Sequence, residues 1–219
     1  MRRGRQVILL TGFGPFPGAP RNASSILVEE LARAAGRRLP GFTVHAQTLP
    51  TEWKAGPERL AALLGDLSPA VTVHFGVSHR ARGFVVETRA RNTRQDVVDA
   101  CGAAPDDACV TGHGPQEMSA TLPTGLIVER LRRRGLPVQL SRDAGGYLCN
   151  AILYHSLADT RAREAGPIAS RRGFIHIPDR LPIGRGGGAR RACASLLDWD
   201  GALEGGLEIL SVCAGVGER

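Results

Sequence analysis

The chain of 219 residues is 42% hydrophobic and 22% charged, which excludes an intrinsically disordered protein. No apolar run approaches the roughly 20 residues that cross a bilayer, so a transmembrane protein is excluded as well. The formal net charge of +7 suits acidic partners, but Lys54 is the only lysine and aromatic residues make up only 5%. The arginines are mostly scattered along the chain. We therefore expect neither nucleic acid nor a membrane as a partner.

The five cysteines are the next compositional feature. Their number is odd, and the apolar run at residues 7–10 is too short for the core of a signal peptide. We therefore expect a cytoplasmic protein without a disulfide framework. Cys101, Cys109 and His113 match no common zinc spacing, so we expect no metal site.

Strand-like and helix-like segments alternate along the chain. Strands are predicted at residues 6–11, 42–49, 71–75, 84–87, 138–140 and 174–177. Helices are predicted from the caps Ser24 and Ser25 to Gly36, and at residues 57–67, 123–134, 150–157, 189–197 and 202–212. This order predicts an α/β fold, a three-layer α/β/α sandwich with a mainly parallel, mixed central sheet, as one domain over residues 1–219. Residues 92–122 are the least structured stretch, and a loop of that length is usually functional or mobile.

Two glycine-rich segments are candidate binding loops. Residues 11–18 follow a strand and precede a helix, but Pro15 and Pro17 remove amide donors that a phosphate would need. Phe13 and Phe16 in this turn suit a flat, uncharged ligand, although a self-packed loop remains the alternative. Residues 184–188 are read as a flexible loop rather than an anion site.

Cys149 is the candidate nucleophile. A strand ends near Ser141, glycines allow a sharp turn, and Cys149 then opens a predicted helix. The positive potential of a helix N-terminus favours thiolate over thiol, and its unpaired amides can receive a developing oxyanion. A buried packing cysteine is the alternative at this point.

His176 and Glu87 are candidate partners of that thiol. His176 lies at the end of an apolar strand, directly before Ile177 and Pro178, and is a candidate base. Glu87 ends the apolar run 84–86, where a carboxylate needs a partner. Either His176 or one of the surrounding arginines can supply it.

Together these motifs resemble pyroglutamyl peptidase type I, also called pyrrolidone-carboxylate peptidase. Residues 141–150 follow the S-x-x-A-G-x-[FY]-x-C-N signature of that family's nucleophile, and residues 173–178 are similar to its GFIHxP motif. Residues 11–16 with Asn22 and Ser24, residues 49–51, and Gly76 with residues 87–92 are similar to three further blocks in the same order.

The resemblance implies a cofactor-free thiol peptidase that removes pyroglutamate from the N-terminus of peptides. Cys149 would be the nucleophile, His176 the general base and acid, and Glu87 the group that orients the imidazole. It also implies a homo-oligomer, a dimer or tetramer. The residues that would line the substrate pocket are Phe13, Phe16, Asn22, Thr51, Val77, Tyr147 and Leu148.

The segment after Glu87 departs from the family pattern. Val97 stands where family members carry an arginine, Arg94 is the nearest replacement, and Val77 stands where a glutamine is common. Two alternatives therefore remain open: a related thiol amidohydrolase with altered N-terminal specificity, and a catalytically weak relative that binds peptides.

Overall fold

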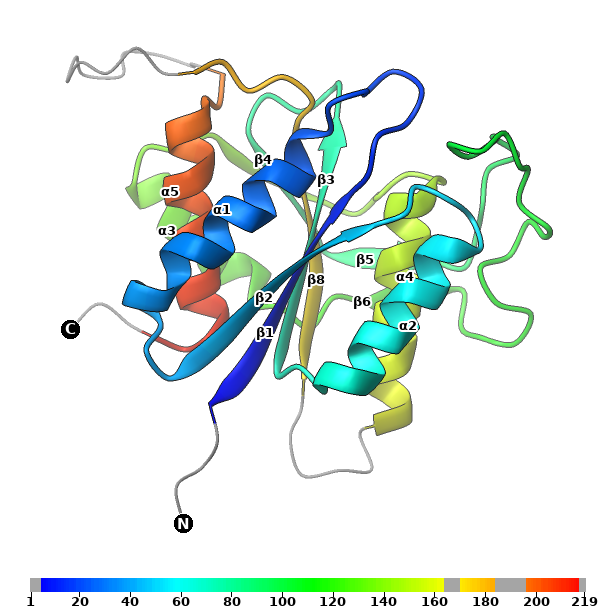
Figure 1. The fold of residues 1–219 in the computed structure, drawn as a ribbon, viewed down its shortest axis with the longest axis horizontal. Helices are drawn as coiled ribbons and strands as arrows, with labels where there is room; N and C mark the ends of the chain where they lie inside the picture. The colour runs from blue at the N-terminus through cyan, green and yellow to red at the C-terminus, as the bar shows by residue number, and fades with distance from the viewer. Residues whose placement is uncertain (1–4, 164–169, 184–195, 217–219) are drawn as a thin grey trace.

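The computed structural model describes residues 5–163, 170–183 and 196–216. Its central sheet has six strands in the order β2-β1-β3-β8-β4-β7 (Figure 1). Neighbouring strands run parallel except β4 and β8, which are antiparallel. The strands are β1 (Gln6–Phe13), β2 (Phe42–Leu49), β3 (Val71–Ser78), β4 (Phe84–Glu87), β7 (Val138–Ser141) and β8 (Arg171–Pro178).

Helices cover both faces of this sheet, which confirms the predicted three-layer sandwich (Figure 1). One face carries α1 (Ala23–Arg38), α3 (Thr124–Arg133) and α5 (Trp199–Cys213), and the other carries α2 (Ala55–Leu67) and α4 (Leu148–Arg163). Alternation along β1 serves both layers, because Ile8 and Leu10 enter one core cluster while Leu9 enters the other. No helix among the described residues is long and apolar enough to cross a membrane.

A second, two-stranded sheet has one of its strands within the region that we expected to be largely irregular. β5 (Arg89–Arg91) pairs antiparallel with β6 (Glu117–Ser119), so the expectation for residues 92–122 is only partly right. The side chain of Asn92 also pairs with the backbone of Thr111, donating to its carbonyl and accepting from its N–H, both at 2.9 Å. These contacts order a segment whose sequence shows no hydrophobic periodicity.

Several element ends differ from the prediction. The N-cap of α1 is Asn22, whose side chain accepts from the N–H of Ser24, and the helix continues past Gly36. Of the helix expected at residues 189–197, residues 189–195 lie outside the described part of the chain, and the last two residues are not helical. The glycine-rich segment 184–188 and Cys193 also lie outside it.

Candidate active site

The three candidate catalytic residues come from two strands and one helix. Cys149 is the second residue of α4, His176 lies near the end of β8, and Glu87 is the last residue of β4. In the antiparallel pairing of β4 and β8, Glu87 lies opposite Phe174, two residues before His176. Residues two apart on a strand share one face of a sheet, so the carboxylate reaches the imidazole diagonally.

His176 and Glu87 form a buried hydrogen-bonded pair. The imidazole Nδ1 lies 2.9 Å from Oε1 of Glu87, and the two residues are 8% and 1% exposed. An ionised carboxylate only accepts hydrogen bonds, so Nδ1 carries the proton and Nε2 is left for another partner. Burial lowers the pKa of His176, but the charges and hydrogen bonds of Cys149 and Glu87 outweigh it and raise that pKa to about 10.

Cys149 lies within hydrogen-bonding reach of this imidazole, in the first turn of α4. The carbonyl of Tyr147 accepts from the N–H groups of Asn150 and Ala151 at 3.1 and 3.3 Å, which closes the turn around the cysteine. The first N–H groups of a helix have no partner within the helix. Since Tyr147 takes those of Asn150 and Ala151, the N–H groups of Leu148 and Cys149 are the ones left for a ligand. Cys149 itself is partly exposed, as a nucleophile must be.

Two other cysteines, Cys101 and Cys213, lie in environments that do not activate a thiol. Burial raises the pKa of the Cys213 thiol to about 12, despite the nearby Arg171. A hydrogen bond with Glu52 raises the pKa of the exposed Cys101. A raised thiol pKa reduces the thiolate fraction at neutral pH, so neither resembles a nucleophile.

Asn150 attaches the nucleophile helix to the segment that follows Glu87, a role that our sequence analysis did not identify. Its side chain accepts from the N–H of Arg91 and donates to the carbonyl of the same residue, both at 2.8 Å. It also donates to the carbonyl of Thr93 at 2.9 Å. Asn150 is 1% exposed, so this pairing is shielded from water.

Gly76 and Phe174 lie directly beside the thiol and the imidazole. Gly76 is paired with His176 across β3 and β8. A Cβ atom at Gly76 would lie 2.6 Å from Cζ of Phe174 and 3.1 Å from Sγ of Cys149. The centroid of the Phe174 ring lies 4.8 Å from that of His176. The absent side chain therefore makes room for both the phenyl ring and the sulfur.

A small pocket opens next to Cys149. Its volume of about 50 Å³ is far below the roughly 300 Å³ of a drug-sized ligand site, so it suits a small ring. The structure brings all seven residues of the expected substrate pocket together with the nucleophile: Phe13, Phe16, Asn22, Thr51, Val77, Tyr147, Leu148 and Cys149.

Two of these lining residues hold the first loop in place. The carbonyl of Gly14 accepts from Nδ2 of Asn22 at 3.1 Å and from Oγ1 of Thr51 at 2.9 Å. Phe16 then lies with its ring centroid 6.4 Å from that of Tyr147. The rings of Phe16 and Tyr147 therefore form walls of the pocket, and the side chains of Asn22 and Thr51 hold the loop that carries Phe16.

Neither Arg94, which we considered as a replacement for the family arginine, nor Val97 lines this pocket. Arg94 donates to the carbonyl of Val110 at 3.2 Å, and its guanidinium carbon lies 5.7 Å from the ring centroid of Trp53. The side chain of Val97 is 46% exposed. Neither residue is among those that line the space next to Cys149.

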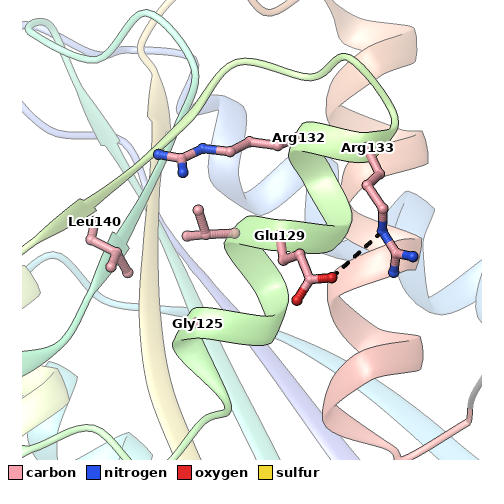
Figure 2. A pocket seen from close by; sticks show the side chains of 6 residues that line it. Gly125, Glu129, Arg132, Arg133 and Leu140 are labelled. Carbon is pink, nitrogen blue, oxygen red and sulfur yellow. Dashed lines mark ion pairs between the residues drawn. The ribbon is translucent and has the colours of Figure 1, made fainter.

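A larger hollow lies elsewhere, between α3 and β7 (Figure 2). It is open and has a volume of about 500 Å³. Figure 2 shows the side chain of Glu129 turned toward Arg133, with which it forms an ion pair at 3.9 Å. Its lining residues include neither a cysteine nor a histidine, so it offers no nucleophile and no imidazole base: Gly125, Val128, Glu129, Arg132, Arg133 and Leu140.

Comparison with known proteins gives one consistent answer. The sequence profile of the pyroglutamyl peptidase family matches residues 6–183. The pyrrolidone-carboxylate peptidase of Cupriavidus pinatubonensis is 36% identical over 174 residues, covering 79% of this chain and 78% of its own. Mouse pyroglutamyl-peptidase 1 is 31% identical over 187 residues, covering 84% and 83%. A mutant pyrrolidone carboxyl peptidase from Pyrococcus furiosus superposes with a TM-score of 0.81 at 25% identity, covering 96% and 99%.

Proposed function

Because the chain belongs to the pyroglutamyl peptidase family of cysteine peptidases, we propose that it removes an N-terminal pyroglutamyl residue from peptides. One observation carries this proposal. A small pocket walled by aromatic rings lies directly beside a thiol that is hydrogen-bonded to a buried imidazole. Its volume suits a five-membered lactam, and its position next to Cys149 suits attack on the carbonyl that follows this ring.

The proposed mechanism uses Cys149 as the nucleophile and His176 as the acid and base. The thiolate attacks the pyroglutamyl carbonyl carbon, and the developing oxyanion is received by N–H groups in the first turn of α4. The protonated imidazole then gives its Nε2 proton to the leaving amine, which releases the shortened peptide and leaves a thioester. In the second half, the imidazole takes a proton from water, the hydroxide displaces the thiolate, and pyroglutamate leaves.

Glu87 keeps the imidazole in the orientation that these proton transfers require. Its carboxylate holds the proton on Nδ1, so that Nε2 faces the sulfur. The same negative charge favours the imidazolium that forms when the thiol loses its proton. Thiolate, imidazolium and carboxylate thus follow one another in a row, which is the arrangement of a catalytic triad.

Selection of pyroglutamate follows from the walls of the pocket. A lactam is flat and neutral, so it can lie between Phe13, Phe16 and Tyr147 without burying a charge. An N-terminal glutamate would bring a carboxylate and an ammonium group to these rings, and burying unpaired charges there is costly. An N-terminal proline lacks the lactam carbonyl. A donor of the pocket that would bond to this carbonyl would then be left unpaired.

The proposed chemistry needs only these side chains and water, so no cofactor takes part. We place the enzyme in the cytoplasm, where a reducing environment suits the free cysteines Cys101, Cys109, Cys149 and Cys213. We further propose one catalytic domain over residues 1–219 and a homo-oligomeric assembly. Limited proteolysis tests the single domain, and light scattering tests the assembly.

A direct assay tests the proposed function. Matched fluorogenic amides of pyroglutamate, proline and glutamate are hydrolysed by the purified chain, and their kcat/KM values are compared. We expect kcat/KM for the pyroglutamyl amide to exceed that for the prolyl amide by about 10- to 100-fold or more, because proline would leave one buried donor of the pocket unpaired. Equal turnover of prolyl and pyroglutamyl amides would instead indicate a thiol amidohydrolase of different specificity. Tight binding without turnover would indicate a peptide-binding relative.

A further inference from the structure

Asp99 ties a short turn together behind the substrate pocket. Asp99 is 3% exposed, and its carboxylate accepts from three backbone N–H groups. Oδ1 accepts from Cys101 and Ala103 at 2.9 and 3.0 Å, and Oδ2 accepts from Trp53 at 2.9 Å. Burial raises the pKa of this carboxyl, but the backbone hydrogen bonds outweigh it and hold the pKa below its ordinary value. The group is therefore ionised at neutral pH.

Backbone atoms of this turn contact two residues that line the pocket and a third residue, Trp53, that packs against one of them. The N–H of Ala100 donates to the carbonyl of Thr51 at 3.0 Å. The indole N–H of Trp53 donates to the carbonyl of Val97 at 2.8 Å, and the hydroxyl of Tyr147 lies 3.5 Å from the carbonyl of Val98. Thr51 and Tyr147 both line the pocket, and the Trp53 ring packs edge-on against Tyr147 with centroids 5.2 Å apart.

The valine side chains of the turn take no part in this attachment. Val97 and Val98 are 46% and 55% exposed, while their carbonyls are the atoms used. A change of side chain at position 97 therefore leaves the attachment intact. Asp99 is different, because its carboxylate joins the turn to the segment that contains Thr51 and Trp53.

We propose that Asp99 is a positioning residue that fixes the Thr51 and Tyr147 walls of the pocket and thereby sets the affinity for the pyroglutamyl ring. This proposal rests on the proposed function, because it concerns how the same pocket binds the pyroglutamyl ring. Cys149, His176 and Glu87 are held by α4, β8 and β4, and none of the contacts of Asp99 reaches them directly. Loss of the carboxylate should therefore weaken substrate binding and leave the chemical step unchanged.

The kinetic test is Asp99→Asn, which keeps the shape and removes the charge. We expect KM for a pyroglutamyl amide to rise by about tenfold, because hydrogen bonds to a charged acceptor are lost, with kcat close to wild type. The matched control is Asp107→Asn. Asp107 accepts one N–H two residues ahead, that of Cys109, in the same long segment, and among the described residues its side chain forms no hydrogen bond or ion pair with the pocket wall. Its kinetics should equal those of the wild type.

A second readout does not depend on turnover. Iodoacetamide labelling of Cys149, followed by peptide mass spectrometry, reports the thiolate, and protection by 2-pyrrolidone reports the pocket. Asp99→Asn should leave the unprotected labelling rate unchanged and weaken the protection about tenfold. A wild-type chain without pyroglutamyl hydrolysis and without protection would refute the proposed function itself, whatever Asp99 does.

A third readout tests the wall without any ligand. In a Trp199→Phe background, Trp53 is the remaining tryptophan, and acrylamide quenching measures its accessibility. Asp99→Asn should increase that quenching. Trp53→Phe, which deletes the indole N–H, should raise KM in the same way if Asp99→Asn does not fold. Unchanged KM, protection and quenching in folded Asp99→Asn, or a fall in kcat with unchanged KM, would overturn the proposal.

Discussion

The imidazole Nδ1 of His176 lies 2.9 Å from Oε1 of Glu87, although the two residues are 89 positions apart in the sequence. Their strands are the only antiparallel neighbours in the six-stranded sheet of the described residues. Both side chains are almost fully buried, so water cannot replace either partner easily. The pairing therefore fixes the imidazole before any substrate arrives.

Substitution of Glu87 should expose this role. Glu87→Gln keeps the shape but loses the charge that favours the imidazolium, so kcat should fall by about 10²-fold or more while KM changes little. His176→Ala removes the acid and base, and kcat should fall at least as far. Steady-state kinetics on a pyroglutamyl amide measure both. Wild-type values for His176→Ala would show that another group transfers the proton.

The cysteines should differ in their reactivity with iodoacetamide at neutral pH. Cys149 should react fastest, because it is partly exposed and hydrogen-bonded to an imidazole that can accept its proton. Cys213 should react slowest among the described cysteines, because its pKa is raised to about 12. Mass spectrometry of labelled peptides over time gives the order, and Cys149→Ser should abolish turnover while the fold is retained. Earlier labelling of Cys101 together with an active Cys149→Ser variant would contradict the assignment.

Phe174 should affect the catalytic pair rather than the pocket. Phe174→Leu keeps an apolar side chain but loses the flat ring beside His176, so kcat should fall and the pH profile of Cys149 alkylation should shift. The control is Phe75→Leu, since Phe75 is also fully buried but belongs to the core on the opposite face of the sheet. It should lower stability by about 1–3 kcal/mol without shifting that profile. Identical profiles in both variants would contradict the role of Phe174.

Gly76→Ala provides an independent test of the same geometry. The added Cβ would lie 2.6 Å from Phe174 and 3.1 Å from the sulfur of Cys149. The ring and the thiol must therefore both move away from this Cβ. This variant displaces the ring that Phe174→Leu removes. The pH profile of Cys149 alkylation should shift in the same direction as in Phe174→Leu.

The residues that the sequence revealed are those with a local signature. Cys149 follows a glycine-rich turn at a helix start, and His176 precedes a proline at a strand end, so each could be found from its neighbours. The family resemblance added the pocket residues, which the structure gathers beside the thiol. The contact between Glu87 and His176 was one of two alternatives, because the antiparallel pairing of β4 and β8 leaves no local trace.

The residues that the sequence did not reveal act through distant backbone atoms. Asn150 pairs with Arg91 across 59 positions, and Asp99 accepts from Trp53 across 46. Neither contact depends on the partner's side chain, so no pairing of residue types marks it. The sequence also did not reveal β5 and β6, for a different reason. Each strand is three residues long, which is too short for a periodic pattern of hydrophobic residues.

Arg94 is the residue for which sequence and structure give different expectations. If it replaced the arginine absent at Val97, then Arg94→Ala would lower kcat. In the structure its guanidinium contacts the Val110 carbonyl and the Trp53 ring instead, so we expect kcat within about twofold of wild type. The unfolding free energy should fall by about 1 kcal/mol, from a lost hydrogen bond and a lost cation–π contact. Arg82→Ala, at an exposed site, is the control, and kinetics with urea unfolding measure both effects.

The fully buried His74 and the half-buried His155 should make the protein less stable in acid. Burial lowers the pKa of His74 to about 3, and burial together with the charge of Arg94 lowers that of His155 to about 4. Above pH 6.5 both histidines are neutral in the folded and the unfolded chain, so they add no pH dependence there. Below pH 6.5 the unfolded chain binds protons that the folded chain does not. The unfolding free energy should therefore fall by up to about 1.4 kcal/mol per pH unit for each histidine.

The other shifted groups do not reverse this trend. The raised pKa of His176 gives a contribution that is fully present below pH 6.5 and is lost as pH rises toward 10, so it adds no slope in acid. The lowered pKa of Asp99 gives a contribution that is lost as pH falls, which acts in the same direction as His74 and His155. His155→Gln should reduce the slope between pH 6.5 and 4, whereas substitution of the exposed His79 by glutamine should not. Urea unfolding at a series of pH values measures the slopes, and equal slopes for wild type and His155→Gln would show that this imidazole takes up its proton without unfolding.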